Sequence, residues 1–184
     1  MTIHHDKLAY GKLASTREEL SEDRLLEMLS ELESEAEIRE STGEEAALRD
    51  ILALSEAWER ENSCYGYRKN EKGDIEGRRI FTAEREGKTV GYLFGRKEYL
   101  KNTSSVAPDG TEYFEIEEIY VVAEYRSMGI GRALYEFLEE RLKEEGTDYI
   151  FLSTATKDWR KIFHFYIEEL GMEFWSARLF KKLR

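Results

Sequence analysis

The run from Arg126 to Gly131 has the residue types best suited to chemistry in this sequence. It reads Arg-Ser-Met-Gly-Ile-Gly, between a strand-like run that ends at Val122 and a helix-like run that begins near Arg132. Glycines let the backbone approach an anion closely, the first N–H groups of a helix point at it, and an arginine adds a charge-assisted hydrogen bond. The run therefore predicts an anion cradle for a ligand that carries phosphates. The cradle comprises Arg126, Ser127, Met128, Gly129, Ile130, Gly131 and Arg132.

The same residues have a purely structural interpretation. A helix that begins with small residues so that it packs closely against a sheet would have a similar sequence. The dinucleotide-binding spacing Gly-x-Gly-x-x-Gly is not completed, because position 134 is Leu134, and the P-loop motif is absent. The cradle is therefore neither of these two phosphate-binding motifs.

Two motifs together resemble the GNAT superfamily of N-acetyltransferases. Arg-x-x-Gly-x-Gly after the strand-like residues 116–121 is similar to the acetyl-CoA-binding core of that superfamily. Residues 165–172 are similar to its later Phe-Tyr-x-x-x-Leu-Gly-Phe helix end, and the two motifs occur in the expected order. The resemblance extends from about Arg78 to the C-terminus. It implies a mixed α/β fold with two splayed central strands and the element order β-α-α-β-β-β-α-β-α-β.

The resemblance also implies a binding site for acetyl-CoA as cosubstrate. The pantetheine arm and acetyl group would lie along Ile119, Tyr120 and Val121, with the Val121 N–H polarising the thioester carbonyl. The pyrophosphate would rest on residues 127–132. Trp159 stands where many relatives place a cofactor-binding asparagine, and we include it in the expected site.

Glu117 is the candidate general base for acetyl transfer to an amine. The reaction needs a base because an alkylammonium, with a pKa of about 10.4, must lose a proton before it attacks. Strict alternation along a strand places Glu117 on the face of Ile119 and Val121, opposite Glu118. Glu117 also matches the proposed base of the related diamine and polyamine acetyltransferases, acting directly or through water. Alternatively, these glutamates only cover a solvated strand face.

Tyr166 is the candidate general acid. It occupies the tyrosine position of the Phe-Tyr motif, where the resemblance implies a hydroxyl within reach of the CoA sulfur. A departing thiolate gains from an acid that returns a proton to it. The alternative is an aromatic side chain that packs against the strands, with its hydroxyl bonded to the backbone.

Composition restricts the partners and the compartment. A chain of 184 residues with 41% hydrophobic content suits one domain, 1–184, and a net charge of −11 disfavours nucleic acid and anionic membranes. That charge suits a cationic small substrate, although acidity also promotes solubility. Cys64 is the only cysteine, no apolar run suits a signal peptide or membrane span, and the histidines lack metal-ligand spacing. We expect a cytoplasmic protein without a metal.

The hydrophobic patterns and turn signals divide the chain into strands and helices. Gly146 and Gly171 follow two of the helices, as C-terminal caps do. A polar stretch, 33–45, separates the first two helices. Strands are expected at 8–14, Arg79–Arg85, 89–99, 112–122, 149–153 and 176–183, and helices at 25–32, from a capping box at Thr42-x-x-Glu45 to before Tyr65, from the cradle to Gly146, and at 159–170.

The acceptor is expected to be a primary amine of a small molecule or a peptide. Residues 175–181 and 116–118 are similar to segments of the spermidine/spermine acetyltransferases, which makes a polyamine or diamine an alternative. The acceptor pocket is expected at 33–45 and near aromatic residues that could contact an alkylammonium through their rings. Those residues are Tyr65, Tyr67, Tyr99 and Trp175. Aromatic side chains also serve the core or a homodimer interface.

Two other classes of protein stay open on the sequence. In one, the chain binds acetyl-CoA but Glu117 and Tyr166 are only structural. In the other, it is an interaction protein whose cradle holds no ligand.

Overall fold

The computed structural model describes residues 36–41, 45–102 and 105–183, which lie almost entirely within one compact unit, Glu37–Arg184. The strand expected at 8–14, the helix expected at 25–32 and the cap expected at Thr42 lie outside the described residues. Among the described helices, none combines the length and the apolar character that crossing a membrane requires.

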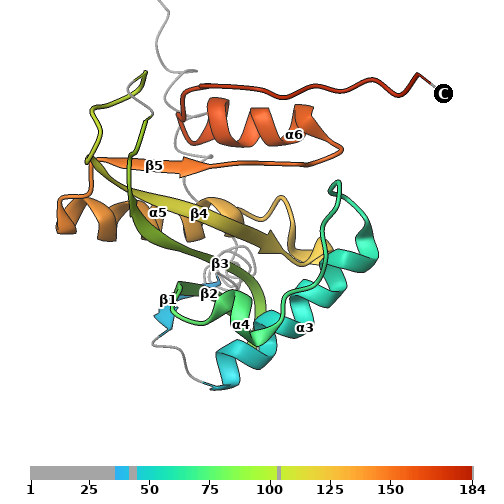
Figure 1. The fold of residues 1–184 in the computed structure, drawn as a ribbon. Coiled ribbons are helices and arrows are strands. Elements are labelled where there is room, and N and C mark those ends of the chain that lie inside the picture. Colours follow the sequence, from blue (N-terminus) through green and yellow to red (C-terminus); the bar gives the residue numbers. More distant parts are fainter. Residues whose placement is uncertain (1–35, 42–44, 103–104, 184) are drawn as a thin grey trace, which may run out of the picture. The chain divides into compact units, whose positions relative to one another are not determined.

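A five-stranded mixed sheet forms the centre of this unit (Figure 1). Its strands lie in chain order, the first four antiparallel to their neighbours and the fifth parallel to the fourth. This confirms the expected mixed α/β fold. The strands are β1 (Glu37–Ser41), β2 (Arg79–Arg85), β3 (Lys88–Tyr99), β4 (Glu112–Val121) and β5 (Tyr149–Leu152).

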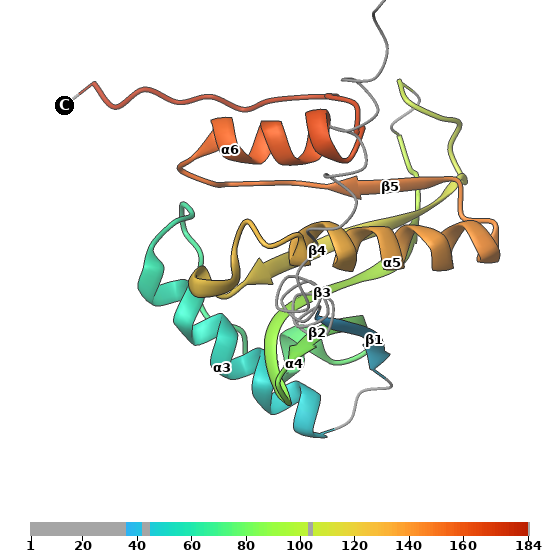
Figure 2. The ribbon, with the colours of Figure 1, turned by 180° about the vertical axis from the view of Figure 1, so that it is seen from behind.

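Helices cover both faces of the sheet, which Figures 1 and 2 show from opposite sides. Successive strand residues point to opposite faces. On one face, Tyr92 of β3 packs in a cluster with Ile51 of α3. On the other, Gly91 lies close to Leu134 of α5. The helical elements are α3 (Glu45–Glu61), α4 (Lys72–Ile75), a 3-10 turn η1 (Ala123–Tyr125), α5 (Ile130–Glu145), α6 (Trp159–Phe163) and a π-helical segment η2 (His164–Glu169).

The local sequence signals located most of these elements correctly. The expected hairpin is β2 and β3, and α5 ends as expected at Gly146, whose φ of 77° is left-handed. The polar stretch 33–45 is not only a loop, because Glu37–Ser41 pairs with β2 as the edge strand β1. Charged side chains are common on edge strands, whose outer side faces water.

The strand expected at 176–183 is wrong. Residues 171–183 have no regular secondary structure, and Leu179 is 91% exposed. Alternating residues favour an extended chain, but a strand also needs a neighbour whose N–H and C=O groups complete the ladder. The described residues supply none for this segment.

The central strands separate after a short parallel pairing. β4 pairs with β5 from Tyr113↔Tyr149 to Ile116↔Leu152, and the pairing ends there. The rest of β4, from Glu117 to Val121, stays bonded to β3 but has no strand on its other edge within the described residues. Figure 1 shows the two strands diverging. The splayed strands expected from the sequence are therefore present.

Candidate active site

The separation from β5 leaves backbone polar groups of β4 on an open edge. The Val122 N–H donates to the Val90 carbonyl of β3 at 2.9 Å. Because backbone groups of successive residues point to alternate sides of a strand, the N–H groups of Ile119 and Val121 point away from β3. They face the side that β5 has left, where an extended ligand could bond to them.

The cradle lies directly beyond the end of this edge. Ser127 and Gly129 both have left-handed backbones, with φ of 63° and 79°, and Gly129 is the N-cap of α5. The first intrahelical bond runs from Ala133 N–H to the Gly129 carbonyl at 2.9 Å. The N–H groups of the preceding three residues have no intrahelical acceptor, so they suit an anion. An unusual backbone at a non-glycine residue such as Ser127 is also typical of functional turns.

The two cradle glycines serve different purposes. A Cβ at Gly129 would meet no atom within 4 Å, so its requirement is the left-handed backbone. A Cβ at Gly131 would lie 3.3 Å from the Phe165 ring, so its requirement is close packing of α5 against η2. The structural interpretation of the motif therefore applies to Gly131, whereas Gly129 shapes the turn.

Arg126 makes its charge-assisted hydrogen bonds inside the protein. Its Nη2 donates to both carboxylate oxygens of Glu61, at 2.8 and 2.7 Å, and its Nε donates to the Val121 carbonyl at 2.8 Å. The guanidinium lies over the Tyr120 ring, 5.3 Å from its centroid. Arg126 thus joins the end of β4 to the end of α3, a role that the sequence did not indicate.

The other cradle residues and Trp159 differ in exposure. Met128 and Trp159 are 56% and 51% exposed, and the Arg160 guanidinium lies 4.4 Å from the Trp159 ring centroid. Arg132 donates to a carboxylate oxygen of Glu169 at 3.0 Å. This ion pair and the Gly131 contact both join the start of α5 to η2.

Glu117 lies on the other face of the sheet from the one expected. The register of β3 and β4 passes from Phe94↔Glu118 to Gly95↔Ile116, so Glu117 is the extra residue of a β-bulge. Its carboxylate accepts from Arg78 Nε at 2.6 Å and lies 3.3 Å from Arg96 Nε. Arg96 shares its face with Tyr92 and α3, whereas Ile119 and Val121 share theirs with α5.

A signal for this bulge is present in the sequence. Gly95 interrupts the strand pattern, and a Cβ there would lie 2.0 Å from the Glu115 carbonyl oxygen. A glycine inside a strand pattern often marks a bulge or a close backbone approach. The alternation rule failed because the bulge adds one residue between Ile116 and Glu118.

Tyr166 lies in the π-helical segment η2 and is 8% exposed. Within the described residues its hydroxyl makes no hydrogen bond to the protein. Burial raises the pKa of Tyr166 above its ordinary value, so the hydroxyl keeps its proton at neutral pH. A protonated hydroxyl without a protein acceptor is available to donate to a ligand.

Glu118 is the site residue that the sequence did not single out. Its Oε2 accepts from Tyr92 Oη and Asn70 Nδ2, both at 2.8 Å, and from Tyr67 Oη at 3.3 Å. Burial raises the pKa of Glu118 despite these three donors. A signal was available, because a carboxylate inside an apolar strand is costly to bury without a partner or a role.

The aromatic residues expected at the acceptor pocket do not come together. Tyr65 and Tyr67 lie between α3 and α4, next to the separated strands. Tyr99 pairs with Glu112 at the opposite end of β4, and Trp175 Nε1 donates to Ser105 Oγ at 3.2 Å. Spacing along the sequence gave no information about these distances in the fold.

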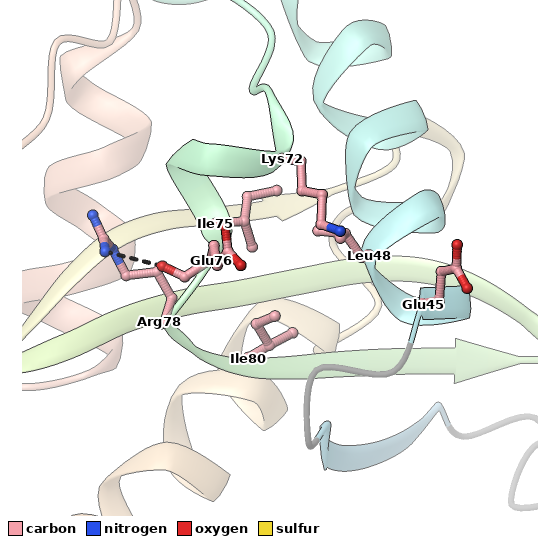
Figure 3. A pocket seen from close by; sticks show the side chains of 8 residues that line it. Glu45, Leu48, Lys72, Ile75, Glu76, Arg78 and Ile80 are labelled. Atoms are coloured by element: carbon pink, nitrogen blue, oxygen red, sulfur yellow. Dashed lines mark hydrogen bonds between the residues drawn. The ribbon is translucent and has the colours of Figure 1, made fainter.

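A separate pocket of about 420 Å³ opens between α3, α4 and the start of β2 (Figure 3). Apolar Leu48, Ile75 and Ile80 line it together with charged side chains. Arg78, which contacts Glu117, also lines this pocket. The complete lining is Glu45, Leu48, Lys72, Ile75, Glu76, Gly77, Arg78 and Ile80.

The separated strand edge and the N–H groups at the start of α5 suit an extended ligand that has an anionic part. The model of the acetyltransferase (GNAT) family matches residues 45–172. The chain therefore belongs to this family, as its motifs indicated, and the family's cosubstrate is acetyl-CoA.

Solved structures share the fold at low sequence identity. A transcriptional regulator from Bacillus halodurans is 22% identical with a TM-score of 0.59, over 80% of this chain and 99% of that one. An aminoglycoside acetyltransferase from an uncultured soil metagenomic sample is 19% identical with a TM-score of 0.57, over 81% and 97%. An aminoglycoside N-acetyltransferase in complex with CoA is 16% identical with a TM-score of 0.57, over 80% and 99%. No curated protein matches the chain significantly. Within the part of the chain that the structure describes, no three or more potential metal ligands cluster.

Proposed function

We propose that this protein transfers the acetyl group of acetyl-CoA to a primary amine of a small molecule or peptide by direct attack. The observation that carries the proposal is the separation of β4 from β5 next to the cradle. An open strand edge suits the amide groups of a pantetheine arm, and the free N–H groups at the start of α5 suit a pyrophosphate.

The chain's own residues would hold acetyl-CoA in two places. Ile119, Tyr120 and Val121 would lie along the arm and the acetyl group, with the Val121 N–H at the thioester carbonyl. Residues 127–132 would hold the pyrophosphate, and Arg126 would take part if it exchanged Glu61 for phosphate. Trp159, exposed at the start of α6, would also contact the cofactor.

In the proposed reaction, the amine nitrogen forms a bond to the acetyl carbon while the carbon–sulfur bond breaks. The proton lost by the amine passes to Glu117, directly or through water, and the leaving thiolate receives a proton from Tyr166. The high pKa of Tyr166 supports an acid that is protonated at neutral pH. The two arginines at Glu117 favour a water-mediated path, because both carboxylate oxygens already have a cationic neighbour.

The acceptor is the least specified part of the proposal. Two of the similar structures are aminoglycoside acetyltransferases, and the chain carries a net charge of −11, which suits cationic amines. A polyamine or diamine is the narrower alternative. A module that binds acetyl-CoA without catalysis is the other alternative, in which Glu117 and Tyr166 only stabilise the fold.

Two further proposals concern the environment of the enzyme. We place it in the cytoplasm, and we propose a homodimer, because Leu179, Phe180 and Leu183 are strongly exposed in the single chain. Light scattering after size exclusion measures the oligomeric state.

Thiol release separates the enzyme from its alternatives. The protein is incubated with acetyl-CoA and a panel of primary amines, while free thiol is followed. Amine-dependent release supports the proposal. Binding of acetyl-CoA without release would support the module, and absence of binding would support an interaction protein.

A further inference from the structure

The loop between α3 and α4 connects β4 to the segment that follows β5. At residues 62–65 it bonds to the segment that follows β5, because Tyr65 N–H donates to Ala155 O at 2.8 Å and Lys157 N–H donates to Ser63 O at 2.9 Å. Further along, Asn70 and Tyr67 bond to Glu118 of β4. We call residues 62–70 the bridging loop. It links the segment that follows β5 to Glu118 of β4, on the face of the sheet that α3 covers.

Only one of the two carboxylate oxygens of Glu118 accepts hydrogen bonds from the described residues. All three of its hydrogen bonds go to Oε2, from Tyr92, Asn70 and Tyr67. Within the described residues Oε1 has no hydrogen-bond partner. The three donors fix the orientation of the carboxylate and leave one oxygen available.

The described residues give Glu118 no cationic partner. Its three hydrogen-bond donors are two hydroxyls and an amide, and no ion pair of the described part involves it. A partly buried carboxylate without a cation is costly, and such sites are often functional. Glu117, by contrast, has two arginines. A cationic group of a ligand would complete the Glu118 site and not the Glu117 site.

Aromatic rings accompany this carboxylate. The Tyr67 ring lies 4.1 Å from the Trp58 ring, centroid to centroid, and the Trp58 indole N–H donates to Ser63 Oγ of the bridging loop at 3.0 Å. A carboxylate binds an alkylammonium by accepting hydrogen bonds from its N–H groups. The face of an aromatic ring, such as that of Tyr67, can also attract the positive charge. The chemistry of the site therefore suits a cationic aliphatic amine.

We propose that Glu118 binds an ammonium group of the acceptor and so makes cationic alkylamines the substrate class. This inference rests on the proposed acetyl transfer. Glu118 lies on the open stretch of β4, one residue before Ile119, so an amine held by Oε1 from the side of the bridging loop lies next to the expected position of the acetyl group. Glu118 is in this account a specificity residue, and Glu117 keeps the role of base.

The test measures spermidine binding by calorimetry to the CoA-loaded protein at physiological ionic strength. It compares the wild type with Glu118→Gln and Glu115→Gln. Glu115 lies on the same strand and the same face, and its loss changes the net charge equally, but among the described residues it has no such hydrogen-bond network. We expect Glu118→Gln to weaken binding roughly tenfold to a hundredfold, as for a lost charge-assisted hydrogen bond, and Glu115→Gln to leave it within about twofold.

Two results would overturn this inference. One is equal spermidine affinity in the two variants, which would mean that only the net charge of the protein matters. The other is that the wild type does not bind spermidine. Calorimetry with CoA alone shows whether each variant is folded and still binds CoA. Because thiol release is measured separately, an enzyme that acetylates amines with unchanged affinity in Glu118→Gln would refute the role of Glu118 and leave the proposed function intact.

Discussion

The two sides of the gap beside β4 are built in different ways. The cradle side uses backbone groups of consecutive residues from 126 to 132, shaped by the left-handed Ser127 and Gly129. The bridging-loop side uses side chains that come together over long separations, such as Asn70 and Glu118, which are 48 positions apart. The proposed cosubstrate side therefore depends on neighbouring residues in the sequence, whereas the proposed acceptor side depends on contacts between distant segments.

The largest effect is expected at Tyr166, the proposed general acid. Tyr166→Phe removes the proton donor for the leaving thiolate, so kcat should fall by roughly a hundredfold or more. Affinities for CoA and for the amine should change little. Thiol release measures kcat, and calorimetry measures CoA binding. Unchanged turnover with intact CoA binding would assign the ring to packing alone.

Gly129→Ala tests whether the left-handed turn on the cradle side is needed for CoA binding. The left-handed backbone costs a residue with a Cβ roughly 1–2 kcal/mol, and relaxation of the turn would displace the N–H groups, so CoA affinity should fall roughly tenfold. Gly110→Ala is the matched control, because Gly110 has a φ of 89°, equally open surroundings and a turn remote from the cradle. Equal loss of CoA affinity in both variants would show a general loss of stability instead.

The sequence located the elements that follow from short patterns. The β2–β3 hairpin, the helix after the cradle and its end at Gly146 were predicted because a turn or cap depends on neighbouring residues. The face of Glu117 was not, because one bulge residue reverses the alternation. The strand expected at 176–183 failed because pairing needs a partner that a pattern does not contain. Glu118 was missed because its donors come from two segments that are distant from it in the sequence, the bridging loop and β3.

Glu118→Gln should have opposite effects on binding and on stability. A carboxyl whose pKa is raised in the folded state destabilises the fold as the pH rises through that pKa, because the folded site disfavours the charge. The amide carries no charge, so the variant should melt slightly higher than the wild type at pH 7. The difference should vanish below the unfolded carboxyl pKa of about 4.3. Melting curves from pH 4 to 8 measure it, and a variant less stable throughout would contradict the assignment.

The smallest effect is expected at Glu61, which joins α3 to the start of the cradle. Glu61→Gln weakens the pair with Arg126, and the partly exposed geometry limits the loss of stability to roughly 1 kcal/mol or less. CoA affinity should stay the same or rise, because Arg126 is freed to reach a phosphate. Urea unfolding and CoA calorimetry measure the two quantities. A large fall in CoA affinity would mean that Arg126 positions the cradle instead.

We propose that the open edge of β4 and the start of α5 together hold a CoA thioester. The most direct measurement is a crystal structure of the protein with CoA bound. We expect pyrophosphate oxygens within hydrogen-bond distance of the N–H groups of residues 127–132. We also expect the pantetheine arm to be hydrogen-bonded to the backbone at Ile119 and Val121. CoA bound elsewhere, or an arm that leaves the edge of β4 uncontacted, would contradict it.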